Sequence, residues 1–162
     1  MARSTQPFDG LRVDSTAAIL ELMISIRPAH SEDLDVLRSL DVLAHDDRER
    51  RELISSAVAD RNCYVALSES EVIGYGVLNY AFYRHGWIEL VYVGEHNRRR
   101  GVGKALLKYM EAQCRTSKLF TSTNLSNLPM QRLLMKLGYT VSGIVDNLDD
   151  ADPEIVYFKR RN

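Results

Sequence analysis

Apolar and polar residues alternate along the chain in two periods, one typical of strands and one typical of amphipathic helices. The first half predicts a short strand over 24–27, a helix with its apolar face at Leu34, Leu37 and Leu40, and a helix capped by Asp46 or Asp47. The rest predicts strands over 62–68, 71–80, 87–93, 119–124, 140–145 and 154–159, and helices over 102–116 and 126–138. In the last helix, Ser126 is the expected cap, Pro129 lies in the first turn and Gly138 ends the helix.

The order of these elements predicts a mixed α/β fold, with a mixed central sheet flanked by helices on both faces. A two-residue turn, Glu69-Ser70, joins the strands over 62–68 and 71–80, which indicates an antiparallel hairpin. The helix between the strands over 87–93 and 119–124 is a crossover, so those two strands should be parallel. We expect one domain over residues 23–162, preceded by an appendage of unknown role over residues 1–22.

Composition narrows the class of protein. The 162 residues carry 21 Lys and Arg against 22 Asp and Glu, and this balance argues against general nucleic-acid binding. No apolar run approaches the about 18 residues that a membrane-spanning helix needs. Cys63 and Cys114 match no metal or redox spacing, and the four histidines form no ligand-spaced pair, so we expect buried thiols, no metal and a cytoplasmic location.

One segment departs from this neutrality. The stretch NRRRGVGKALL, residues 97–107, places three arginines and two glycines at the start of a predicted helix. Free N–H groups and the helix dipole make such a start an anion-binding site, and Gly101 and Gly103 allow close approach of a phosphate. The spacing lacks the third glycine of a dinucleotide-binding turn and the Lys-Ser or Lys-Thr pair of a P-loop.

Two motifs resemble those of the GNAT superfamily of acyl-CoA-dependent N-acyltransferases. The first is Arg98-x-x-Gly101-x-Gly103, which follows the apolar strand that ends at Val93. The second is the segment from Asn127 to Tyr139, which is similar to the family's N-x₅-L-Y-x-K-L-G-F helix. The resemblance covers roughly residues 24–160 and implies the GNAT fold.

The resemblance also implies a site for acetyl-CoA, the acyl donor. The backbone of Val91, Tyr92 and Val93 would bond the pantetheine arm as an added strand. Arg98 would close over the pyrophosphate, and Asn127 would lie beside the pantetheine arm. The pyrophosphate would be held by backbone N–H groups of Arg99, Arg100, Gly101, Val102, Gly103 and Lys104.

Direct transfer of acetyl to an amine within a ternary complex calls for a base, because an amine of pKa about 10.4 is mostly protonated at neutral pH. Glu89, a carboxylate inside an apolar strand, is the candidate, acting directly or through water. The N–H of Val91 is a candidate donor to the thioester oxygen. Many family members carry a tyrosine general acid where this chain has Leu134, so Tyr92, Tyr139 or water would take that role, or the thiol would leave as thiolate.

The acceptor is less clearly encoded. The acidic segment over 146–154 would either attract a cationic small-molecule or peptide amine or form a plain turn. Tyr80, Tyr83, Arg84 and His85 are candidates for the other side of the same opening. We expect no nucleic-acid or membrane partner, and a homodimer is compatible with the sequence. The missing tyrosine keeps open a non-catalytic acyl-CoA-binding or regulatory module.

Overall fold

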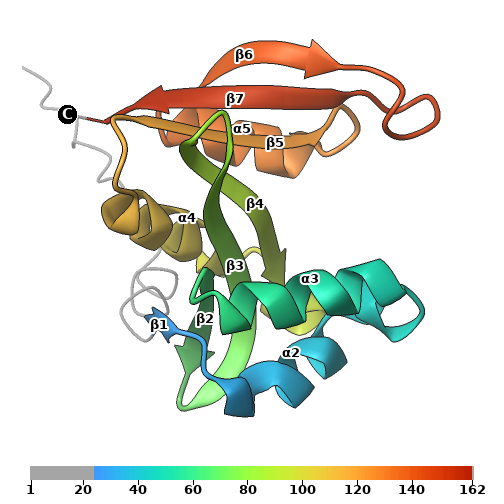
Figure 1. Ribbon diagram of the computed structural model, residues 1–162, viewed down its shortest axis with the longest axis vertical. Helices are drawn as coiled ribbons and strands as arrows, with labels where there is room; N and C mark the ends of the chain where they lie inside the picture. Colours follow the sequence, from blue (N-terminus) through green and yellow to red (C-terminus); the bar gives the residue numbers. More distant parts are fainter. Residues whose placement is uncertain (1–23, 162) are drawn as a thin grey trace, which may run out of the picture.

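A seven-stranded sheet spans residues 24–161, the part of the chain that the computed structural model describes (Figure 1). The strand order is β1-β2-β3-β4-β5-β7-β6. The strands are β1 (Ile24–Pro28), β2 (Cys63–Ser68), β3 (Glu71–Phe82), β4 (His85–Val93), β5 (Lys118–Asn124), β6 (Thr140–Val145) and β7 (Glu154–Arg160). The predicted strands and the mixed α/β class are confirmed, while the appendage expected over 1–22 lies outside the described residues.

Helices cover both faces of this sheet, as the sequence predicts (Figure 1). They are α2 (Leu34–Leu40), α3 (Arg48–Ala59), α4 (Val102–Gln113) and α5 (Leu128–Lys136), with short 3-10 turns at Ser31–Asp33, Val42–His45 and Glu95–Asn97. Leu37 and Ile54 bring α2 and α3 into one apolar core, whereas Leu106 and Leu134 bring α4 and α5 into a second core. The two cores therefore lie on opposite faces of the sheet.

The contact between β4 and β5 is short and parallel, as the crossover predicts. Only Gly86, Trp87 and Ile88 of β4 pair with β5, opposite Leu119, Phe120 and Thr121. Beyond this contact the two strands run in different directions (Figure 1). The segment of β4 from residue 89 to residue 93 therefore has β3 on one side and an unpaired edge on the other. We call this opening the β4–β5 fork.

A bulge changes the direction of one side chain on β4. Val77 of β3 pairs with Leu90, but the next residue, Leu78, pairs with Ile88. Glu89 is therefore the extra residue of a β-bulge, and bulges commonly re-aim a side chain next to a functional site. Here the bulge places Glu89 on the α3 face of the sheet, where it borders a pocket.

Local details follow the sequence in most places. Asp47 caps α3 by accepting from Glu49 and Arg50, and both cysteines are buried and free, as expected. The cap of α5 is a correction: Asn127, not Ser126, caps this helix and accepts from Met130. Ser126 is instead bonded through its N–H and its hydroxyl to Asp152.

Neither a membrane span nor a metal cluster is found within residues 24–161. No helix there is long and apolar enough to cross a membrane. No group of three or more His, Cys, Asp or Glu side chains is placed to hold a metal ion in the same residues.

Candidate functional site

The start of α4 offers a set of unpaired backbone donors. Gly101 caps the helix in a left-handed conformation, φ +86°, which glycine adopts without steric cost. The backbone N–H groups of residues 99 to 103 make no hydrogen bond within residues 24–161. Because the dipole of α4 adds partial positive charge here, this turn has the geometry of an anion site.

Gly103 marks where this turn meets the fork. A Cβ built on Gly103 would lie 3.7 Å from Leu133 of α5, 3.9 Å from Val93 and 4.0 Å from Val91 of β4. These are ordinary van der Waals distances, so the protein itself has room for a methyl group. A glycine that internal packing does not require is consistent with a backbone left accessible to a ligand.

The three arginines are exposed, and two of them make local contacts. Arg98 donates from Nε to the carbonyl of Val93 at 3.2 Å, and its guanidinium lies 6.0 Å from the Tyr92 ring centre. Arg100 donates to the side-chain oxygen of Asn97 at 3.3 Å. Arg98 thus lies across the end of β4, beside the backbone expected to bind pantetheine.

Asn127 has a structural task that the sequence did not reveal. Its Oδ1 accepts from the backbone N–H of Met130 at 3.3 Å and caps α5. Its Nδ2 makes no hydrogen bond within the described residues. The cap therefore leaves the amide donor available, and the pantetheine contact stays a prediction.

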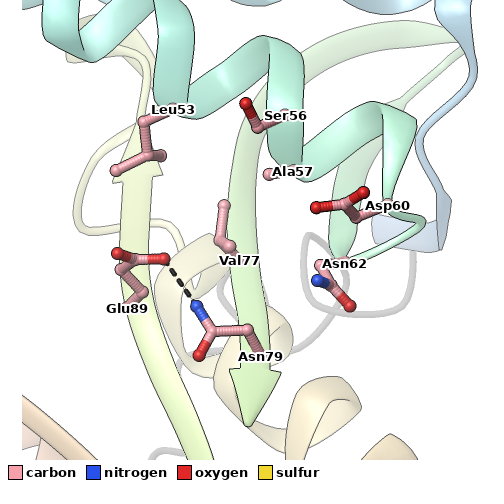
Figure 2. Close-up of a pocket in the computed structure, with 8 residues that line it drawn as sticks. All are labelled: Leu53, Ser56, Ala57, Asp60, Asn62, Val77, Asn79 and Glu89. Atoms are coloured by element: carbon pink, nitrogen blue, oxygen red, sulfur yellow. Dashed lines mark hydrogen bonds between the residues drawn. The ribbon is translucent and has the colours of Figure 1, made fainter. Parts of the chain in front are cut away.

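On the other side of the sheet, Glu89 borders a pocket of about 320 Å³ beneath α3. Figure 2 shows the pocket, which is lined by Leu53, Ser56, Ala57, Asp60, Asn62, Val77, Asn79 and Glu89. Asn79 donates from Nδ2 to Oε2 of Glu89 at 2.6 Å, while its Oδ1 accepts from the N–H of Ala81 at 3.0 Å. The second bond fixes the amide so that its donor end faces the carboxylate.

Two further residues line this pocket, Asn79 and Asp60, and neither is among the predicted site residues. Asn79 carried a usable signal, because it is a polar residue within the apolar run of β3. Asp60 directly follows α3, and because polar residues are common at exposed helix ends, nothing in the sequence distinguishes it as a pocket residue. In the structure its carboxylate faces into the pocket from the side opposite Glu89 (Figure 2).

The tyrosines proposed as general acids are both buried. The Tyr92 hydroxyl accepts from the N–H of Val42 at 3.2 Å, on the side of α2. Tyr139 packs in the core of α4 and α5, and burial, with the charge of Glu111, raises the pKa of its hydroxyl. Leu134 has an exposed fraction of 0% in the same core.

The residues expected around the acceptor divide between the two faces. Tyr80 packs against the α4 core and accepts from the N–H of Arg115 at 2.9 Å, so it lies on the face of the sheet opposite the pocket that Glu89 borders. Tyr83 is 81% exposed, and the His85 ring lies 6.0 Å from that of Phe120.

In the acidic loop, Asn124 donates to Asp149, and Ser126 donates to Asp152, which supports the plain-turn interpretation for these two carboxylates.

Comparisons with known proteins agree with this geometry. The profile of the Acetyltransferase (GNAT) family matches residues 25–139. A GNAT-family acetyltransferase from Bacillus cereus is 31% identical, with a TM-score of 0.81 over 86% of this chain and 99% of that one.

More distant structures share the fold. Ard1 from Thermoplasma volcanium is 19% identical, with a TM-score of 0.75 over 86% and 99% of the two chains. Arabidopsis thaliana Naa50, solved with the bisubstrate analogue CoA-Ac-MVNAL, is 16% identical, with a TM-score of 0.70 over 86% and 99%. No curated protein matched the chain. From the family match and the Bacillus structure, we conclude that this chain belongs to the GNAT family of acetyltransferases.

Proposed function

We propose that this GNAT-family acetyltransferase transfers acetyl from acetyl-CoA to the primary amine of a small molecule, by direct attack within a ternary complex. The observation that carries the proposal is the position of β4 between two features. Its edge, which pairs with no strand, opens toward the donors at the start of α4, and its bulge places Glu89 at the pocket under α3. A donor and an acceptor could thus approach one strand from two sides.

The residues at the fork fit acetyl-CoA. The segment from Val91 to Val93 pairs with no strand on the fork side, so an extended pantetheine arm could bond to it as an added strand once Arg98 releases the Val93 carbonyl. The turn before α4 offers backbone N–H groups and arginines for the phosphates. Asn127 Nδ2 offers one further donor beside α5.

Glu89 would take the proton of the attacking amine, directly or through one water. The amine nitrogen then forms a bond to the acetyl carbon, and the N–H of Val91 stabilises the negative charge on the carbonyl oxygen. Collapse of the intermediate breaks the C–S bond. Since Leu134 offers no proton, coenzyme A leaves as a thiolate, for which a thiol pKa of about 8.5 is suitable.

Replacing Gly103 by alanine is expected to weaken acetyl-CoA binding by about tenfold or more while leaving the fold intact. The added methyl fits against Leu133 and β4, and alanine favours a helix over glycine by about 1 kcal/mol. The same methyl stands between the backbone and an approaching phosphate. Calorimetric titration with acetyl-CoA and urea unfolding measure the two effects.

The matched control for Gly103→Ala is Ala105→Gly, two residues further along the same helix. It should lower helix stability by about 1 kcal/mol and leave acetyl-CoA affinity near the native value. Unchanged affinity in Gly103→Ala would place the phosphates away from this turn.

The acceptor class is tested by release of free thiol from acetyl-CoA with separate groups of amines: arylalkylamines, alkylamines, polyamines, aminoglycosides and short peptides. The protein's own thiols interfere little, because both cysteines are buried and burial raises the pKa of Cys63 to about 12. We expect the highest kcat/KM for thiol release with one small-molecule group. Release only with peptides would contradict the small-molecule acceptor.

A non-catalytic acyl-CoA-binding module is the second candidate. The observation that favours it is Leu134, which is fully buried where many family members carry a tyrosine acid. This candidate predicts tight acetyl-CoA binding without thiol release for any amine. The same two measurements therefore separate the candidates.

A further inference from the structure

Four aromatic side chains form a row on the sheet that belongs to neither core. They are Phe82, Trp87, Phe120 and Phe158, and we call this row the aromatic platform. Phe82 stacks on Trp87 with ring centres 4.8 Å apart, Phe82 lies 5.1 Å from Phe120, and Phe120 lies 5.2 Å from Phe158. All four are partly exposed, so they form a continuous surface of ring faces and edges.

Strand register places this platform on the face opposite α4 and α5. Along β5, Leu119 and Thr121 are buried while Phe120 between them is only half-buried. Phe158 lies directly opposite Phe120, and opposed residues share a face of the sheet. In Figure 1, α5 lies behind β5 and β7, and no described helix crosses in front of them.

The platform begins beside Glu89. Trp87 pairs with Asn79, the residue that donates to the Glu89 carboxylate. The pocket under α3 and the platform are therefore neighbouring parts of one face. On this face of the sheet, the carboxylates of Glu89 and Asp60 lie at the pocket, and the aromatic rings lie at the opposite end.

We propose that the acceptor is a small arylalkylamine, with its nitrogen at Glu89 and its aromatic ring on the platform. This inference rests on the proposed function and names its substrate class. A protonated amine complements the two carboxylates before it transfers its proton, and a flat ring complements the aromatic surface. Polyamines and aminoglycosides carry no aromatic ring that would stack on the four side chains.

Trp87 gives a readout that does not depend on acetyl transfer, because it is the only tryptophan in the chain. We expect 2-phenylethylamine to change Trp87 fluorescence saturably in the absence of acetyl-CoA. Hexylamine, which carries a similar amine without a ring, should bind about 3–10-fold more weakly, the range of an aromatic contact. Equal dissociation constants for the two amines would contradict the proposal that the platform binds the ring of the acceptor.

Phe120→Leu and Phe158→Leu remove rings from the platform while keeping apolar side chains and Trp87. Each should raise the dissociation constant and KM for phenylethylamine about 3–10-fold and leave those for hexylamine unchanged. The control is Tyr109→Leu, which removes from α4 a ring that packs against Tyr64 of β2, outside the platform, and should change neither. Equal loss for both amines in the two phenylalanine variants would mean general damage to the sheet and would contradict the proposal.

Different results would contradict the arylalkylamine acceptor and the acetyl-transfer function on which it rests. Ring-dependent binding at Trp87 without acetylation of any amine would contradict the acetyl-transfer function and, with it, the acceptor assignment. Acetylation of alkylamines and arylalkylamines at equal kcat/KM would support acetyl transfer but contradict binding of the acceptor's ring on the platform. Preference for a peptide that begins with phenylalanine over phenylethylamine would overturn the small-molecule acceptor.

Discussion

Replacing Glu89 by glutamine is expected to lower kcat for amine acetylation by about 10²–10⁴-fold, the range for a general base. Glutamine has the same shape and keeps an oxygen that can accept from Asn79, so the bulge and the pocket should persist. Only the capacity to take a proton is lost. Because the proposed acetyl-CoA contacts lie at the fork and at the start of α4, acetyl-CoA affinity should stay near the native value.

The control for this variant is Glu71→Gln, which removes an exposed carboxylate at the start of β3. It should leave kcat and KM unchanged, so a general effect of net charge is separated from an effect of position. Thiol release and calorimetric binding of acetyl-CoA give the two quantities. A native rate in Glu89→Gln would assign the base to another group or to solvent.

Asp41→Ala is expected to destabilise the protein by about 3–5 kcal/mol, which is typical when one partner of a buried ion pair is removed. Asp41 is fully buried and accepts from Tyr75 at 2.5 Å and from Arg50 at 2.8 Å. Its other oxygen accepts from the N–H of Leu43 at 3.0 Å. Alanine would leave the Tyr75 hydroxyl and a mostly buried guanidinium without this partner.

Urea unfolding measures this loss, and Arg48→Ala is the control, on α3, the helix that also carries Arg50. Arg48 pairs with Glu52 across an exposed surface, where an ion pair contributes about 0–1 kcal/mol. A loss near 1 kcal/mol in Asp41→Ala would mean that water replaces Asp41 readily. The pair between Asp41 and Arg50 of α3 would then contribute little to stability.

Much of the fold is readable from the sequence because it depends on local periodicity. The strands, the hairpin at Glu69-Ser70 and the parallel crossover between β4 and β5 follow from patterns within one segment or two neighbouring ones. The turn at Gly101 was also readable, since a left-handed helix cap favours glycine. These features need no knowledge of tertiary contacts.

The missing parts of the site depend on register between strands. An alternating pattern alone does not reveal the bulge at Glu89, because the shift is defined by which residues of β3 lie opposite. The choice of Asn127 over Ser126 as helix cap follows from Asp152, which is remote in sequence. The aromatic platform takes one residue from each of four strands, so no linear motif in the sequence indicates it.

The most direct measurement follows an isotopically labelled acetyl group from acetyl-CoA to the amine by mass spectrometry, with native protein and with Glu89→Gln. Our account predicts labelled N-acetylamine in equal amount to the coenzyme A released, and a rate about 10²–10⁴-fold lower in the variant. Acetyl-CoA that binds and stays intact with every amine would contradict acetyl transfer at the fork. Coenzyme A released without labelled amine would contradict it equally, because the acetyl group would then have gone to water.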